Sequence, residues 1–526
     1  MLRRGSLVIV LALTSRALAQ GTEMPQEPGA GSGSGSGSGS ATTSVPEQPP
    51  PSQPTAPDDS APAPVKPERA DEPPQDLLKL FGPTPHEAPT SDSGFRFGSY
   101  GRVGVGTDLR GGKPEKISLV AHGPRIVEPS YLELELSYGF VRQHADTTEP
   151  IILRPIITIA FDDTLFHETG QFDAQPALRN MYLDAKVYNH LSLWCGSRMY
   201  RGDDIYLFDY WPLDDQNLVG AGAEVTQLND LSFAAAVGAN RLEHPFQHQE
   251  IDVANPVQGA TTVEQLNRQR VVVSGSTTYI HMPENATWGA KAKLHAEIHS
   301  LPSGTRKRED GTFEALPHDT GELIGLEVGG FQNEHDGLRR HLNGFIRYAK
   351  GLAAFDELAP PTTFGPELKT SNASELTFGL SGNYDHELGQ LMLGALSRRF
   401  IDADADATDA DDGWEYAVDV RPLARVVRDV YVGADISYQA RFPRGLNPIT
   451  LRAEDPAMFQ IAPMIAFSPM GPSAYDRPQL RLVYRYAHLN DAALDSYVPD
   501  DPRHAHATVH YLGVQAEWWF NSTTYR

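Results

Sequence analysis

The chain has 526 residues and a formal net charge of -24 at pH 7, from 44 Lys and Arg against 68 Asp and Glu. This excess of carboxylates argues against nucleic acid as a partner, because phosphate binding needs concentrated Lys and Arg. Cys195 is the only cysteine, so no disulfide can form within the chain and the fold must hold by packing and hydrogen bonds. We expect Cys195 to be buried and inert.

The first residues have the pattern of an export signal. Arg3 and Arg4 precede a short apolar run over 7–13, and Ala17-Leu18-Ala19 has the small residues of a signal-peptidase site. The run is too short to cross a bilayer as a helix. We therefore interpret 1–19 as a signal peptide.

A low-complexity segment follows. Residues 20–76 are rich in Gly, Ser and Pro, a composition that cannot bury enough apolar surface to fold. We interpret them as a disordered linker, which is either a plain tether or an arm that reaches the cell wall. Residues 77–94 are interpreted as a short amphipathic connector, and 95–526 as one domain.

Alternation of polar and apolar residues predicts the fold of that domain. Residues 131–138 read Tyr-Leu-Glu-Leu-Glu-Leu-Ser-Tyr, so a strand would place three leucines on one face and two glutamates on the other. A soluble sandwich would bury the leucines, whereas a closed membrane barrel turns the apolar face to lipid and the polar face to its lumen. The pattern recurs to the end of the chain, with few helical patterns between.

About eighteen such segments can be counted, and an even number is typical of single-chain bacterial barrels. The sequence thus predicts an all-β fold, a transmembrane antiparallel β-barrel that forms a pore in the outer membrane of a Gram-negative bacterium, with outer-membrane lipid around it. The expected strands are 95–106, 131–140, 153–161, 178–187, 191–199, 218–226, 231–240, 270–280, 287–298, 322–331, 342–350, 374–384, 390–399, 414–422, 430–440, 458–467, 478–487 and 508–520.

Several patches of the barrel, in order along the chain, resemble the maltoporin family of outer-membrane sugar porins. The patches are Ser99–Gly106, Tyr131–Leu134, Ala177–Asp184, Leu193–Trp211, Gly220–Gly222, Arg421–Pro422, Arg477–Arg481 and Gln515–Trp519. The resemblance implies a trimer, a third loop that folds inward and narrows the pore, and passive diffusion of maltodextrin-like oligosaccharides.

The resemblance also implies which residues contact the sugar. Aromatic rings bind the apolar faces of sugar rings while charged side chains exchange hydrogen bonds with the hydroxyls. The aromatic track falls on Tyr100, Tyr131 and Trp519, and Tyr210 or Trp211 is expected at the narrowest point. The polar positions are Arg102, Arg125, Glu133, Arg179, Asp204 and Asp209, with Arg201 beside a position where the family has arginine.

One of these matches and two further positions of the family depart from the expected pattern. Arg179 shares its strand face with Met181 and Leu183, so simple alternation places it outside the lumen. Two other aromatic positions of the family fall on Gln171 and Val426, where no ring is present. A general diffusion porin with little sugar preference therefore remains an alternative.

No catalytic or strong metal motif is found. The sequence has no Gly-x-Ser-x-Gly elbow, His-Glu-x-x-His helix or phosphate-binding loop, so we expect no enzyme. The carboxylates of 402–412 alternate as calcium ligands do, but the glycine and final glutamate of an EF-hand loop are missing, so we favour a solvated acidic loop and keep a calcium site as the alternative. We expect no resident cofactor. An outer-membrane hydrolase and a structural anchor are the remaining alternative functions.

Overall fold

The computed structural model describes residues 92–522 except 144–149, 164–169, 171–174, 189, 229, 285, 336–337, 357, 406–409 and 472. The expected signal peptide and linker lie outside the described residues. The expected connector does too, apart from its last three residues.

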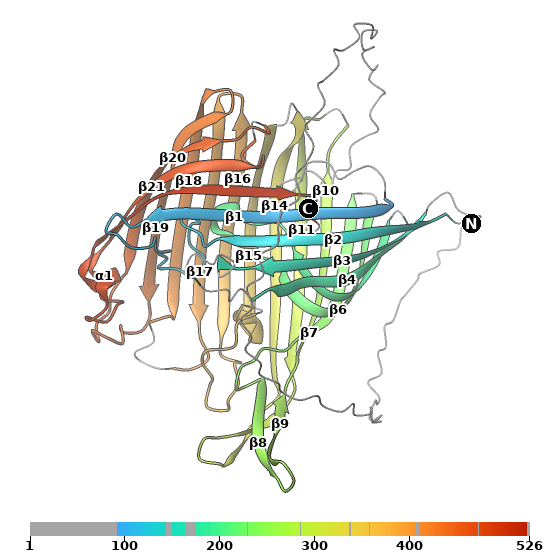
Figure 1. Cartoon of the computed structure of the whole chain (residues 1–526), viewed down its shortest axis with the longest axis vertical. Coiled ribbons are helices and arrows are strands. Elements are labelled where there is room, and N and C mark those ends of the chain that lie inside the picture. The colour runs from blue at the N-terminus through green and yellow to red at the C-terminus, as the bar shows by residue number, and fades with distance from the viewer. Residues whose placement is uncertain are drawn as a thin grey trace, which may run out of the picture. The chain divides into compact units, whose positions relative to one another are not determined.

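Eighteen antiparallel strands form one closed barrel, which confirms the predicted fold class (Figure 1). Each expected strand is present, with ends that differ by a few residues. The strands are β1 (Gly94–Thr107), β2 (Tyr131–Arg142), β3 (Ile151–Phe161), β4 (Ala177–Tyr188), β5 (Leu191–Arg201), β6 (Asp215–Leu228), β7 (Leu231–Asn240), β10 (Arg270–His281), β11 (Trp288–Leu301), β14 (Asp319–His335), β15 (Leu338–Gly351), β16 (Ser374–His386), β17 (Gly389–Ile401), β18 (Gly413–Val427), β19 (Val430–Pro443), β20 (Ala457–Phe467), β21 (Gln479–Leu489) and β22 (Thr508–Phe520).

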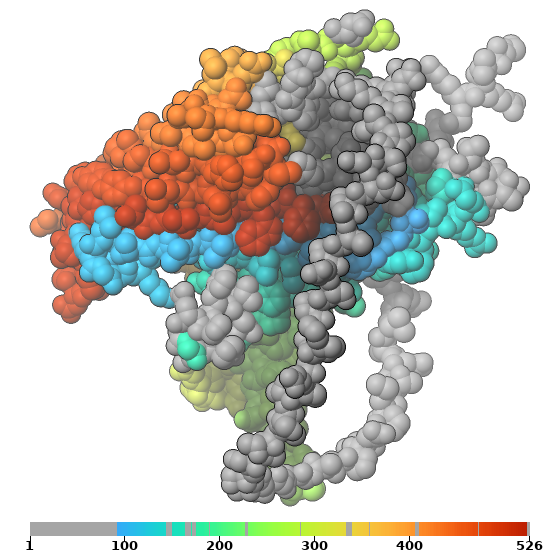
Figure 2. All heavy atoms as spheres, turned by 45° about the horizontal axis from the view of Figure 1, so that its top comes forward, coloured from blue at the N-terminus to red at the C-terminus, as the bar shows by residue number. Residues whose placement is uncertain are grey.

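The first and last strands close the barrel. β1 pairs with β2 on one side and with β22 on the other, so Tyr100 lies opposite both Glu133 and Trp519. Figure 2 shows the red C-terminal strands directly against the blue N-terminal strand. Every strand therefore has two neighbours, and the sheet has no free edge for water or lipid to reach.

The strand faces are oriented as a membrane barrel requires. In β2 the side chains of Glu133 and Glu135 are 1% and 2% exposed, whereas Leu136 and Tyr138 are 40% and 44% exposed. The carboxylates thus lie inside and the apolar residues form the outer surface. This is the inverted assignment that the alternation predicted.

Cys195 lies on that outer surface. It belongs to β5, where it is exposed like its neighbour Leu193 on the same face. The expectation of a buried cysteine was wrong, because the rule that cysteines are buried in soluble proteins does not apply to the apolar exterior of a barrel.

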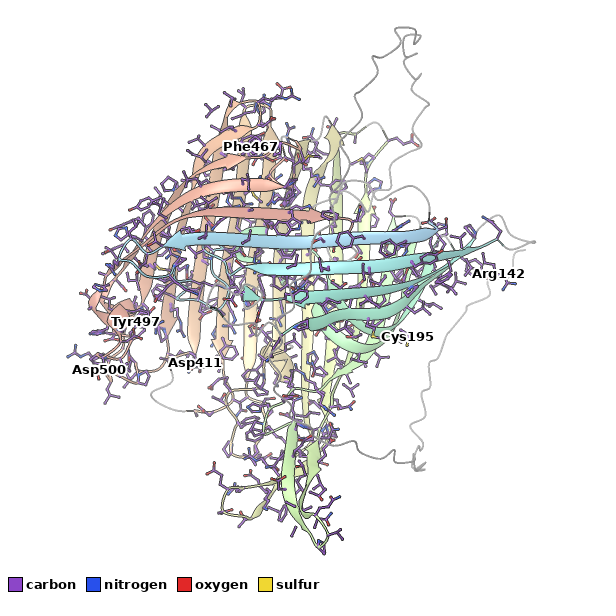
Figure 3. All side chains as sticks on the ribbon, viewed as in Figure 1. Arg142, Cys195, Asp411, Phe467, Tyr497 and Asp500 are labelled. Carbon is purple, nitrogen blue, oxygen red and sulfur yellow. The ribbon has the colours of Figure 1, made fainter. Side chains whose placement is uncertain are left out.

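Long connections gather at one end of the barrel. Figure 3 places Asp411, Tyr497 and Asp500, from two long connections, at one end of the strands and Phe467 at the other. Within the long connections lie two hairpins that the sequence reading missed, β8 (His248–Asn255) with β9 (Gly259–Asn267) and β12 (Gly304–Lys307) with β13 (Phe313–Leu316). The strands β12 and β13 have only four residues each, too few for an alternation signal, and most residues of β8 and β9 are exposed or partly exposed on both faces.

In the described ranges, helix occurs only as short turns. α1 (Asp491–Leu494) has four residues, and the 3-10 turns η4 (Tyr206–Phe208), η5 (Leu352–Ala354) and η6 (Pro502–Ala505) have three or four. In the part of the chain that the structure describes, no helix is both long and apolar enough to traverse a bilayer.

Candidate functional site: the constriction of the lumen

The third loop, 202–214 between β5 and β6, folds into the barrel as expected. Ile205 and Leu207 are 0% and 1% exposed. They pack on the inner wall at Gly379 and Gly394, where an added Cβ would lie only 2.9 Å and 3.1 Å from atoms of Ile205. These two glycines supply the space that the loop occupies, so the loop is seated on the wall of β16 and β17.

The first connection, 108–130 between β1 and β2, is hydrogen-bonded to the third loop. The backbone N–H of Arg125 donates to the carbonyl of Leu207 at 2.9 Å. The guanidinium of Arg125 lies 2.9 Å from Glu128 and 3.4 Å from Glu517, with its carbon 4.9 Å from the ring centre of Tyr206. One arginine thus joins two loops and the barrel wall.

The three rings of the expected aromatic track do come together. Tyr100 and Trp519 are direct neighbours on adjacent strands, and the rings of Tyr100 and Tyr131 are 5.9 Å apart. All three belong to one cluster inside the barrel. Tyr100 and Trp519 are 5% and 6% exposed, however, and Tyr131 alone is partly exposed to the lumen.

Charged side chains surround these rings. Arg102 Nη1 lies 2.9 Å from Glu128 and 3.5 Å from Asp209, and it donates to the Tyr100 hydroxyl at 3.3 Å. Arg125 Nη2 donates to the same hydroxyl at 3.2 Å. Both arginines are therefore paired with carboxylates, which offsets the cost of removing their charge from water.

A β-bulge resolves the apparent misplacement of Arg179. The pairing of β3 with β4 shifts between Thr158 and Ile159, so Arg179 is an extra residue on β4. A bulge re-aims the side chain that it carries. The guanidinium of Arg179 forms an ion pair with Glu133 and donates to the Tyr131 hydroxyl, which itself donates to Glu133 at 2.6 Å.

The remaining expected residues form two separate contacts. The guanidinium carbon of Arg201 lies 3.7 Å from the ring centre of Trp211, while Arg201 Nε donates to Asp215 at 2.9 Å. Tyr210 stacks on His122 of the first connection with ring centres 3.8 Å apart. A position at the narrowest point stays a prediction for Tyr210 and Trp211.

Four residues at the centre of the network were missed as site residues. Tyr206 of the third loop and Tyr475 of the β20–β21 connection (468–478) have ring centres 5.4 Å apart, and both are buried. Arg477 of that connection donates to the Tyr206 hydroxyl, lies 2.9 Å from Glu517, and covers the ring of Trp519 at 4.2 Å. Arg477, Glu517 and Tyr206 stand in family-like patches and could have been found there. Tyr475 lies outside those patches and carries no alternation signal.

Two acids of the third loop have opposite pKa shifts. Burial, reinforced by the nearby Asp209 carboxylate, raises the pKa of Asp204 to about 7. Burial also acts to raise the pKa of Asp209, but Arg125, Arg102 and Arg201 outweigh it and hold that pKa below its ordinary value. The surroundings of the loop therefore favour the protonated form of Asp204 and the ionised form of Asp209.

Two carboxylates of the acidic stretch 402–412 accept hydrogen bonds from the backbone of their own loop. Asp412 accepts from the backbone N–H of Asp402 at 2.6 Å, and Asp402 accepts from that of Asp404 at 3.1 Å. Among the described residues no group of three or more His, Cys, Asp or Glu side chains could hold a metal ion. The alternative of a calcium site in 402–412 falls partly on 406–409, outside those residues, and stays untested.

Comparison with known proteins gives a family match and solved structures of low similarity. Solved structures similar to this chain include OccD3 of Pseudomonas aeruginosa (10% identity, 81% of this chain and 91% of that one, TM-score 0.42) and OccAB1 of Acinetobacter baumannii (11%, 82% and 96%, 0.44). A third is the outer membrane protein opdK of P. aeruginosa (10%, 81% and 98%, 0.41). No curated protein matches the chain. The LamB porin family matches residues 95–520, which is the whole barrel. The chain therefore belongs to the LamB porin family and is a porin of the Gram-negative outer membrane.

Proposed function

We propose that this porin is a carbohydrate-selective channel through which oligosaccharides of the maltodextrin kind diffuse passively. The observation that carries the proposal is the joining of Tyr100, Tyr131 and Trp519 with paired arginines and carboxylates beside an inward-folded loop. Rings and fixed charges side by side suit a solute that has apolar faces and hydroxyl edges.

Tyr131 is the ring that we assign to direct sugar contact. It is partly exposed, its hydroxyl is oriented by Glu133 and Arg179, and the guanidinium of Arg102 lies 5.4 Å from its ring centre. Tyr100 and Trp519 are buried. Tyr100 packs against Tyr131, and Trp519 lies beside Tyr100 on the adjacent strand. Weak contact on an oriented ring lets a sugar bind without being trapped in the pore.

A homotrimer in the outer-membrane lipid is part of the proposal, as are export by the signal peptide 1–19 and a cell-wall contact through the linker. The channel would work without catalysis and without a resident cofactor.

Single-channel recording with a panel of sugars tests the function. A selective pore is blocked by maltotriose at millimolar or lower concentration, with a half-block concentration that falls as the oligosaccharide lengthens. Absence of block by every sugar in the panel would replace the proposal with a general diffusion porin.

That second candidate is favoured by one specific observation. Val426, where the family pattern has a ring, is a 64% exposed aliphatic residue on β18. An interrupted track gives fewer binding positions, so weak block that does not depend on sugar length is the signature of the general porin.

A further inference from the structure

We propose that Tyr475 is a positioning residue of the channel. From one end of the barrel it supports Tyr206 at the tip of the third loop, which enters from the other end, and so it limits how far the constriction opens. The inference goes beyond the proposed function, because a sugar-selective porin and a general porin would both need this support. It rests on the contacts of residues 474–477 in the β20–β21 connection.

The two tyrosines belong to connections at opposite ends of the barrel. The third loop follows the fifth strand of the barrel, whereas the β20–β21 connection follows the sixteenth. In an antiparallel barrel, the connections after odd-numbered and even-numbered strands lie at opposite ends. Figure 3 agrees, since Phe467 at the end of β20 lies at the opposite end from Asp411, which follows the thirteenth strand. The ring centres of Tyr206 and Tyr475 nevertheless lie 5.4 Å apart, so the two connections meet inside the barrel.

The β20–β21 connection spans part of the barrel opening to reach this position. The backbone N–H of Ala474 donates to Asp385 of β16 at 3.2 Å, and the ring centre of Tyr475 lies 6.0 Å from that of His341 on β15. Three strands, β17, β18 and β19, separate β16 from β20 in the barrel wall. A segment that begins at β20 and contacts β15 and β16 therefore crosses the space between them. Tyr475 is only 4% exposed, so these contacts enclose it.

The connection is braced where it meets the third loop. Arg477 Nη1 donates to the carbonyl of Ala474 at 2.9 Å, which closes the segment on itself. The guanidinium of Arg477 also lies 2.9 Å from Glu517 on the barrel wall and donates to the hydroxyl of Tyr206. The ring of Tyr206 thus contacts Tyr475 while its hydroxyl is held by the same segment.

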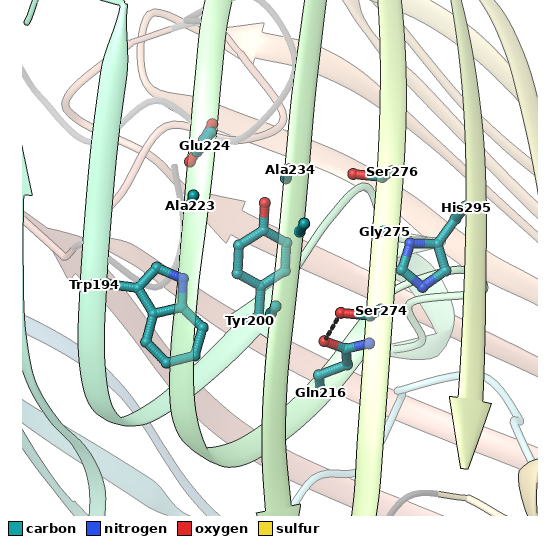
Figure 4. Close-up of a pocket in the computed structure, with 12 residues that line it drawn as sticks. Trp194, Tyr200, Gln216, Ala223, Glu224, Ala234, Ser274, Gly275, Ser276 and His295 are labelled. Atoms are coloured by element: carbon teal, nitrogen blue, oxygen red, sulfur yellow. Dashed lines mark hydrogen bonds between the residues drawn. The ribbon is translucent and has the colours of Figure 1, made fainter. Parts of the chain in front are cut away.

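The third loop is also fixed at one stem, without Tyr475. Lys293 of β11 forms an ion pair with Asp214 at the end of the loop. Gln216, at the start of β6, accepts a hydrogen bond from Ser274 of β10 at 3.0 Å, which Figure 4 shows as a dashed line. This stem is therefore bonded to the wall of β10 and β11, and loss of the Tyr475 ring should release the tip of the loop while the barrel stays closed.

A purely structural role of Tyr475 is the competing reading. Ile205 and Leu207, the sequence neighbours of Tyr206, pack on the wall at Gly394, and these contacts alone could keep the backbone of the tip in place. Removal of the Tyr475 ring would then lower the stability of the fold and leave the ion conductance as it was. The two readings differ in conductance, which is therefore the quantity to measure.

The test uses the full-length protein in planar bilayers with potassium chloride alone, so that no sugar is involved. Tyr475→Ala removes the ring that contacts Tyr206. We expect this variant to spend about fivefold more time than the wild type in a level of higher conductance, the factor that corresponds to one lost aromatic contact. Asp385→Ala removes the acceptor of the Ala474 N–H and should shift the conductance in the same direction.

Two further variants serve as controls. Tyr475→Phe keeps the ring and should conduct as the wild type does. Tyr438→Ala removes a tyrosine that is 49% exposed on the outer face of β19, and it should also leave the conductance unchanged. Heat-modifiable mobility reports folding for every variant.

The outcomes decide between the two readings. More time at higher conductance in Tyr475→Ala, with wild-type behaviour in Tyr475→Phe, would support the positioning role. Wild-type conductance in both Tyr475→Ala and Asp385→Ala would overturn it, whether or not the heat transition falls. If Tyr475→Ala does not fold, Asp385→Ala decides by the same measure. Failure of both variants to fold would also overturn the proposal, because the connection would then be needed for the barrel itself. Absence of maltotriose block in the wild type would end the proposed function and leave this inference standing.

Discussion

The backbone N–H of Arg125 donates a 2.9 Å hydrogen bond to the carbonyl oxygen of Leu207, and this bond ties the first connection of the barrel to the inward-folded third loop. The side chain of Arg125 then reaches the barrel wall at Glu517. The two loops are therefore linked to each other and to the barrel wall, and this link can be probed through the arginine that makes it.

Arg125→Ala should loosen the third loop. The substitution leaves Glu128 without one of its two arginines and removes the cation from the face of Tyr206, and breaking a buried ion pair costs about 3 kcal/mol or more. We expect a lower temperature for the heat-induced mobility change and larger, noisier ion conductance. Arg428→Ala, at a side chain 95% exposed to solvent, is the control. Unaltered conductance in Arg125→Ala would show that the loop is held by its backbone alone.

Tyr131→Ala should weaken sugar block about fivefold, because an aromatic contact contributes about 1 kcal/mol. Ion conductance should stay nearly constant. Tyr138→Ala removes a tyrosine from the same strand, but from the outer face, where the ring is 44% exposed. That variant should affect membrane insertion and leave sugar block alone. The reverse result in the two variants would contradict the assigned role of Tyr131.

Asp204→Asn should change how stability depends on pH. A pKa raised to about 7 means that the folded state holds a proton that the unfolded state releases near pH 4, so wild-type stability falls as the pH rises from 4 to 7 and stays low above 7. The amide removes this loss. The heat transition of Asp204→Asn should exceed that of the wild type at pH 8 and match it at pH 4.

Asp209→Asn should change the pH dependence of stability in the opposite direction. Because the pKa of Asp209 is lowered, its charge stabilises the fold above the ordinary pKa of an aspartate, and this contribution is lost as the pH falls through the lowered value. The variant should be less stable than the wild type at pH 8 and approach it only at acid pH, where Asp209 of the wild type takes up its proton. Parallel pH profiles for the two variants would refute the electrostatic account of the loop.

Deletion of residues 21–75 should leave channel formation intact. A segment of Gly, Ser and Pro contributes no apolar core, so the barrel does not need it to fold. Conductance and heat-modifiable mobility of the shortened protein check this. Failure of the deleted form to insert would mean that the segment takes part in assembly.

The strands were predictable because their signal is local. Alternation over 131–138 specifies which face of β2 meets lipid, and burial of Glu133 beside exposed Leu136 confirms it. The hairpins β8–β9 and β12–β13 were not predictable, since most residues of the first are exposed or partly exposed on both faces and the strands of the second are too short to alternate.

Strand parity could predict site residues only on regular strands, and the loop residues Arg125, Asp204 and Asp209 were reached through the family resemblance alone. Tyr100, Tyr131 and Trp519 follow from strand parity and family resemblance together. Arg179 could not be placed by parity, because a bulge changes the count by one residue. Tyr206 and Tyr475 meet across 269 residues of chain through two loops, and no local pattern encodes such a contact.

The pairing of β1 with β22 also constrains how the protein is made. Tyr100 and Trp519 are neighbours in space although almost the entire barrel sequence separates them, and contacts of such long sequence separation form late and slowly. Until the final strand has been exported, the growing sheet exposes two unpaired edges that could join other chains. Biogenesis therefore demands that the incomplete sheet be shielded, and a chain truncated before Thr508 would present those edges permanently.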